Sequence, residues 1–206
     1  LSASIHYPMR GAVTWKSVVG TNVASDALSN LASTGVTGGS LIILGDDYGE
    51  GSSIMQERTY TFAMKSAIPL IDPRYDMARM VELTEHCFGI SEASNMPVFL
   101  NMRIRACHLT GSFTAKDNKI AEFNANNPIP EQKYDVTKIV LPPASYQHEV
   151  AKFEERLPAA VNYAKEHSIN ELFAGNSTNE KVGIITQGGT YTVVLRALRR
   201  LGAADA

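Results

Sequence analysis

Cysteine, net charge and long apolar segments are all scarce in this sequence of 206 residues. Its two cysteines, Cys87 and Cys107, have no C-x-x-C spacing and form no dense framework. Neither a zinc site nor a disulfide scaffold is therefore expected, and a reducing, cytoplasmic setting is the default. Nineteen basic and twenty-one acidic residues leave a net charge of −2, which gives no broad attraction to nucleic acid or to an anionic membrane.

No apolar run approaches the roughly 20 residues that a membrane-spanning helix requires. The first residues, Leu1 to His6, show neither an initiator Met nor the charged-then-apolar pattern of a signal peptide. We therefore expect a piece of a longer polypeptide. With 44% hydrophobic and 19% charged residues, the chain is large enough for one good core, or for one domain and part of another.

What the sequence does contain, through its first half, is an alternation of apolar strand and amphipathic helix. Strands are predicted at four places: Ala12–Trp15, Leu41–Leu44, Ile68–Ile71 and Val98–Ile104. Helices are predicted from a cap at Thr21 or Asn22 to Gly35, over Ile54–Lys65, and after Asp76. This alternation predicts an α/β fold with a doubly wound, mostly parallel sheet and helices on both faces.

The clearest of these helices follows Asp76, a residue of the N-cap type, and is closed by Asn95 and Pro97. Residues at the three-and-four spacing of one buried face follow the cap, namely Met77, Met80, Val81, Thr84, Cys87 and Phe88. The spacing predicts that this stripe packs against the sheet.

The second half of the chain changes character. Residues 113–175 combine a loop-rich linker, which contains the run NANNPIP, with a charged helix over His148–His167. Residues 176–206 read as the start of a second α/β unit, with a strand at Val182–Thr186 and a helix at Tyr191–Leu201. The turn between them, Gln187-Gly188-Gly189-Thr190, is either an anion-holding helix start or a plain tight turn.

The main chemical candidates follow the second predicted strand. Asp46 and Asp47 stand at its carboxyl end, where open α/β sheets bind ligands. They could hold Mg²⁺ or a ligand's hydrogen-bond donors, or one of them could cap a turn while the other is solvated. Ser52 and Ser53 are of the N-cap type, and Arg58 could hold a carboxylate or remain in solvent.

A nucleophilic reading rests on the adjacent pair Cys107-His108. Neighbours on an extended chain point to opposite faces, so this pair is not expected to be hydrogen-bonded. A thiol enzyme that uses Cys107 remains an alternative.

The order of segments resembles that of the indolepyruvate ferredoxin oxidoreductases. Residues 15–28, WKSVVGTNVASDAL, are similar to the family's K-x-V-G-x-N-V-A-x-D stretch. The segment GSLIILGDDYG, followed by Ser52-Ser53 and Gln56-Glu57-Arg58, is similar to its DDPG…SSQNEQD segment, with Tyr48 where proline is usual. The likeness covers roughly 13–112 and continues at 181–201.

This resemblance implies the thiamine diphosphate-binding fold. Residues 1–112 would be part of the pyrimidine-binding domain, and residues 176–206 the opening of a transketolase C-terminal-like domain. It implies oxidative decarboxylation of 2-oxo acids, with aryl pyruvates such as indolepyruvate as substrates, ferredoxin as electron acceptor and coenzyme A as acyl acceptor. Thiamine diphosphate, Mg²⁺ and iron–sulfur clusters serve the complete enzyme, and the diphosphate, metal and cluster ligands are absent from this chain.

The resemblance and the strand-end position together give the candidate site. Cofactor contacts are expected from Lys16, Gly20, Asn22, Asp46, Asp47 and Ser52. Arg58 is expected to bind the substrate carboxylate, and no catalytic or metal-binding residue is assigned. The site would be completed by other domains or subunits, with a dimer expected. The alternative is a non-catalytic α/β interaction module that kept the fold without the chemistry.

Overall fold

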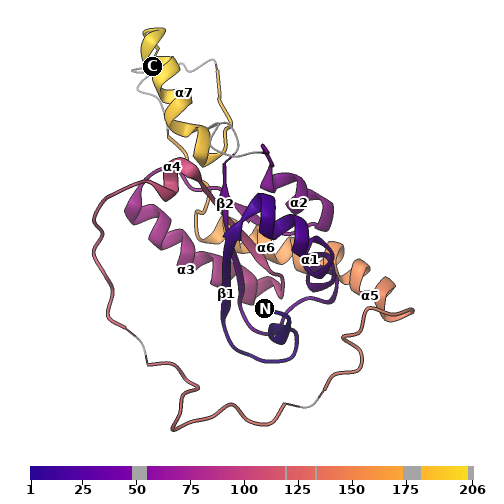
Figure 1. The fold of residues 1–206 in the computed structure, drawn as a ribbon. Coiled ribbons are helices and arrows are strands. Elements are labelled where there is room, and N and C mark those ends of the chain that lie inside the picture. Colours follow the sequence, from indigo (N-terminus) through magenta and orange to yellow (C-terminus); the bar gives the residue numbers. More distant parts are fainter. Residues whose placement is uncertain (48–54, 119, 133, 174–181, 204–206) are drawn as a thin grey trace.

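A four-stranded, all-parallel sheet with the strand order β1-β2-β4-β3 forms the centre of the molecule (Figure 1). The computed structural model describes residues 1–47, 55–118, 120–132, 134–173 and 182–203. The strands are β1 (Gly11–Lys16), β2 (Ser40–Asp46), β3 (Leu70–Ile71) and β4 (Val98–Arg103). All four predicted strands of the first half are present, with their ends shifted by one or two residues.

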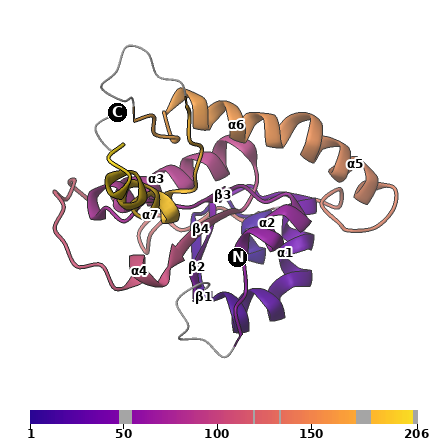
Figure 2. The same ribbon diagram turned by 90° about the horizontal axis from the view of Figure 1, so that it is seen from above.

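Helices cover both faces of the sheet (Figure 2). On one face, α1 (Asn22–Thr34) and α2 (Thr59–Ser66) bury Leu28 and Ala63 against Ile42 and Phe99. On the other face, α3 (Met77–Ser94) and α6 (Leu157–Glu166) pack on the alternate residues of the same strands. The connections from β1 to β2 and from β2 to β3 cross the sheet in one direction, and the connection from β3 to β4 runs back. Because parallel crossovers are right-handed, α3 therefore lies on the opposite face of the sheet from α1 and α2. The fold is therefore α/β with the doubly wound arrangement that the sequence predicted.

Helix α3 begins as predicted, because Asp76 Oδ1 accepts a hydrogen bond of 2.9 Å from the Arg79 amide. Its buried residues are Met80, Leu83, Cys87, Ile90, Ser91 and Ser94. Cys87 and Met80 lie on the predicted stripe, but Val81 is 39% exposed, so its placement in the core was wrong. Leu83 takes that position because the helix turns the 80–83–87–90 row toward the strands.

Helix α1 ends at Gly35 as predicted, with a positive φ of 77° that glycine adopts without strain. Thr21 directly precedes α1, as predicted, but its side chain makes no capping hydrogen bond. Thr21 is already helical because a short π-helix, η2 (Ser17–Thr21), runs directly into α1. The Thr21 hydroxyl instead accepts a hydrogen bond of 3.0 Å from the Trp15 indole. Likewise, α2 begins at Thr59 and not at Ile54, which lies outside the described residues.

The remaining elements are η1 (Ser2–Ile5), α4 (Ile104–Cys107), α5 (Ala144–Ala151), η3 (Lys152–Arg156) and α7 (Gly188–Arg200). The charged helix predicted over 148–167 is the run α5–η3–α6, which starts four residues earlier. Arg156 fastens this run to the end of α1 by donating to the carbonyl oxygens of Ala32 and Ser33, at 3.2 and 2.7 Å.

The strand predicted at Val182–Thr186 is wrong, because this segment is irregular and largely exposed. A strand needs a neighbour to complete its backbone hydrogen bonds, and no strand of the described residues lies beside it. The following helix is present as α7, and the assignment of 176–206 to a second domain stays a prediction. None of the described helices combines the length and the apolar character needed to cross a membrane.

Candidate functional site

A cavity of about 500 Å³ lies where β1, β2 and β4 end. It is lined by Thr14, Trp15, Lys16, Ile43, Gly45, Asp46, Asp47, Met102, Ile104, Cys107 and His108. Ile43 and Met102 also pack against the core on the α3 side of the sheet, so the cavity opens on that side. This is the carboxyl edge at which parallel α/β sheets bind ligands.

Three of the predicted site residues meet in this cavity. Lys16, at the end of β1, forms an ion pair of 2.6 Å with Asp47, which follows β2. The lysine side chain is 42% exposed and the aspartate 15% exposed, so the pair borders solvent and contributes little to stability. It does hold a cation and a carboxylate at fixed positions on the cavity wall.

The third, Asp46, turns away from Asp47. It is only 4% exposed, and its Oδ2 accepts a hydrogen bond of 3.3 Å from the amide of Thr59, the first residue of α2. A negative charge is favourable at a helix start, so this contact stabilises the beginning of α2. The two carboxylates thus make different contacts, Asp47 with Lys16 and Asp46 with the start of α2. No three His, Cys, Asp or Glu side chains gather into a metal site among the residues that the structure describes.

Gly20 and Asn22 lie at the π-helix and the start of α1, behind the cavity wall. A Cβ at Gly20 would overlap the ring of Trp15, so glycine is needed there for packing. The Asn22 amide donates to the carboxylate of Glu57 at 2.5 Å and to the carbonyl of Val18 at 3.2 Å. The cofactor roles of both residues stay predictions.

The two remaining candidates are not part of the described cavity wall. Arg58 is the exposed N-cap of α2, and its carbonyl oxygen accepts hydrogen bonds from Thr61. Its role toward a substrate carboxylate stays a prediction. Ser52 lies outside the described residues.

Comparison with known proteins gives one consistent result. The chain is 29% identical over 192 residues to the indolepyruvate oxidoreductase subunit IorA of Methanothermobacter thermautotrophicus, 29% over 196 residues to that of Thermococcus kodakarensis, and 26% over 183 residues to that of Archaeoglobus fulgidus. These alignments cover 92%, 94% and 89% of this chain.

The chain is therefore similar to IorA subunits over about nine-tenths of its own length. It spans 28% to 30% of the length of these three relatives. No model of a known protein family matches the chain, and no solved structure matches it.

The structure adds Cys107 and His108 to the cavity wall. Cys107 and His108 do not continue an extended strand with side chains on opposite faces, because residues 104–107 form a helical turn. Cys107 Sγ donates to the carbonyl of Met102 at 3.4 Å. Burial, and then the charge of Asp47, raise the pKa of the Cys107 thiol, which disfavours the thiolate that a nucleophile requires. The cavity is thus poorly suited to a thiol enzyme.

Sequence reasoning also missed a set of buried polar atoms beside the same edge. Glu57 Oε2, Thr59 Oγ1 and Asn101 Oδ1 are buried and find no hydrogen-bond partner within the part of the chain that the structure describes. Asn101 pairs with Leu44 across β2 and β4, two residues inside the strand end. Its polar side chain within the run VFLNM, apolar at all its other positions, was an available signal.

Proposed function

We propose that this chain contributes one wall of the active site in an oxidoreductase that decarboxylates aryl 2-oxo acids such as indolepyruvate. The proposal includes thiamine diphosphate as cofactor, coenzyme A as acyl acceptor and ferredoxin as electron acceptor. The observation that carries it is the similarity of about nine-tenths of the chain to subunits named IorA. When bound, thiamine diphosphate supplies the carbanion chemistry, and the protein orients it.

The cavity has the chemistry that one face of such a site requires. Ile43, Met102 and Ile104 give an apolar wall for a flat ring, while Lys16 and Asp47 offer a donor and an acceptor at its rim. In this proposal Lys16 and Asp47 hold the ring end of the cofactor. The proposal assigns Mg²⁺ and the iron–sulfur clusters to other parts of the enzyme.

The test uses the complete enzyme with its partner subunits. We expect indolepyruvate to reduce ferredoxin only when thiamine diphosphate and coenzyme A are both present. We expect Lys16→Ala and Asp47→Asn each to weaken thiamine diphosphate binding about tenfold, since each removes one charged contact. Lys116→Ala is the matched control, because Lys116 forms an exposed pair with Glu85 on α3.

Two outcomes would count against the proposal. A complete enzyme that binds no thiamine diphosphate, with any partner subunit, would support the non-catalytic interaction module instead. Unchanged turnover and cofactor affinity in Lys16→Ala, Asp47→Asn and Arg58→Ala would remove these residues from the site while leaving the family activity intact.

A further inference from the structure

The first turn of α7 meets the body of the molecule at the far side of the same sheet edge (Figures 1 and 2). Gln187 Oε1 accepts a hydrogen bond of 2.7 Å from Arg103, the last residue of β4. A Cβ at Gly188 would overlap the backbone of Asp72 and Arg74. The two glycines therefore let the start of α7 approach the chain after β3 more closely than any other residue could.

The group that faces this turn is the carboxylate of Asp72. Its Oδ2 forms an ion pair of 2.7 Å with Arg103 Nη2, and its side chain is only 5% exposed. A Cβ on Gly189 would lie 2.8 Å from Asp72 Oδ1 and 2.5 Å from Arg103 Nε. A helix start and a guanidinium are the two features that proteins combine to bind anions. Here the anion between them belongs to the chain itself.

Asp72 does not satisfy this site fully. Among the described residues, its Oδ1 and the Nε of Arg103 are both buried without a hydrogen bond of good geometry, although the Gly189 backbone is close enough to lower the pKa of Asp72. Burial is the main cause that raises the pKa of Asp72, and the charge of Asp46 adds to it, while Arg103 and the backbone of Gly189 act in the opposite direction. The carboxylate of Asp72 thus leaves the Nε donor of Arg103 without an acceptor among the described residues.

We propose that Arg103 and the first turn of α7 form a binding site for a phosphate group, in which Asp72 acts as an internal competitor. A phosphate has a third oxygen and a larger charge than a carboxylate, so it can meet the guanidinium and the helix amides at once. Binding of phosphate would displace Asp72 and change how α7 is held to the sheet. This inference goes beyond the proposed oxidoreductase function and does not depend on it.

The test is a titration of the isotope-labelled chain with inorganic phosphate at constant ionic strength, followed through the amide signals of Gly188 and Gly189. We expect weak saturable binding in the wild type and about tenfold tighter binding in Asp72→Asn, which removes the competing charge. Adding Arg103→Gln to that variant should abolish the gain. Asp76→Asn is the matched control, since it removes a carboxylate from the start of another helix and should leave the affinity unchanged.

A parallel titration with AMP separates the two sources of a phosphate group. Equal affinities indicate a free anion, and a higher affinity for AMP indicates the phosphoryl end of a larger ligand. The proposal fails if Asp72→Asn binds phosphate no more tightly than the wild type. If Asp72→Asn does not fold, Gly189→Ala decides, since its Cβ would fill the space beside Arg103 Nε, and wild-type binding that survives this change would overturn the proposal.

Discussion

At the scale of single residues, Gly20 shows that the packing of a neighbouring side chain can require glycine at a position. The ring of Trp15 lies where a Cβ of Gly20 would be, and the indole then reaches Thr21 at the entry to α1. This packing sets the path of the chain just after Lys16. The sequence motif contains this glycine, but only the structure shows the reason for it, which is the position of the Trp15 ring.

We predict that Gly20→Ala destabilises the protein by about 1–3 kcal/mol, the usual cost of overfilling a packed position. Urea unfolding followed by tryptophan fluorescence measures the change. Gly183→Ala is the control, because no described residue lies within 4 Å of the position its Cβ would take. A change in Gly20→Ala as small as the one in Gly183→Ala would contradict this account.

His86 predicts a dependence of stability on pH. It lies between α3 and α6, where its ring contacts Tyr163 and His167, with Glu82, Glu85 and Arg79 nearby. Burial, followed by the charges of His167 and Arg79, lowers its pKa from 6.5, although Glu82 and Glu85 oppose the shift. The unfolded chain therefore takes up a proton at a higher pH than the folded chain does.

Above the ordinary pKa of 6.5, His86 is neutral in both states and costs no stability. As the pH falls from 6.5 through the lower pKa of the folded state, only the unfolded chain gains the proton, so the free energy of unfolding decreases. We expect His86→Gln to flatten the fall of the free energy of unfolding over this range, measured by urea unfolding at a series of pH values. His6→Gln, on a ring that packs against Tyr134, serves as the control. An unchanged slope in His86→Gln would refute the prediction.

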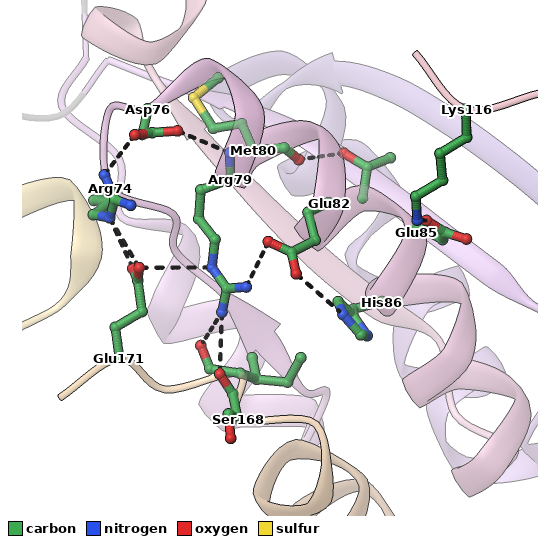
Figure 3. A network of polar contacts seen from close by, with 12 residues as sticks. Arg74, Asp76, Arg79, Met80, Glu82, Glu85, His86, Lys116, Ser168 and Glu171 are labelled. Carbon is green, nitrogen blue, oxygen red and sulfur yellow. Dashed lines mark hydrogen bonds and ion pairs between the residues drawn. The ribbon is translucent and has the colours of Figure 1, made fainter. Parts of the chain in front are cut away.

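At the scale of elements, α3 is held at its start by a polar network that also fastens the segment after α6 (Figure 3). Arg79 donates to the carbonyls of Ser168 and Ile169, at 3.2 and 2.9 Å. Glu171 accepts from Arg74, which in turn pairs with Asp76 at 2.8 Å. The start of α3 and the segment after α6 are thus held by the same two arginines, Arg74 and Arg79.

Replacing Asp76 by alanine should therefore cost about 1 kcal/mol, the typical value for a lost N-cap. The Arg79 amide and then Arg74 lower the pKa of Asp76, so its contribution is present above the ordinary value of 3.8 and is lost as the pH falls through the folded pKa. Asp76→Asn should retain most of the stability at neutral pH, because asparagine also accepts from the helix amides. Thermal unfolding of the two variants compares them, and equal losses would argue against the cap.

At the scale of the whole molecule, the chain returns after a long irregular segment to close the second face of the sheet. Arg156 is the clearest fastening of this return, since its guanidinium meets the carbonyls of Ala32, Ser33 and His148. The partners on α1 lie more than 120 positions away in the sequence, which no local pattern can reveal.

We predict that Arg156→Met destabilises the protein by about 2 kcal/mol, because charged hydrogen bonds to buried carbonyls are among the stronger ones. Amide hydrogen exchange at the end of α1 should accelerate together with exchange in α5 and α6. Arg10→Met, which breaks an exposed ion pair with Glu92, is the control and should change stability by no more than about 1 kcal/mol. Faster exchange in α6 without faster exchange at the end of α1 would show that α1 and α6 are not coupled through Arg156.

The sequence by itself determined the first-half strands, most of the helices and the carboxyl edge where Lys16, Asp46 and Asp47 collect. Such features follow from local periodicity and from the fixed direction of parallel strands. The tertiary structure decided which partner each side chain takes: Asp47 pairs with Lys16, Asp46 with the start of α2, and Asp72 with Arg103 and α7. It also left Val182–Thr186 without a strand neighbour, because hydrogen bonds and ion pairs between distant segments depend on packing that no local pattern contains.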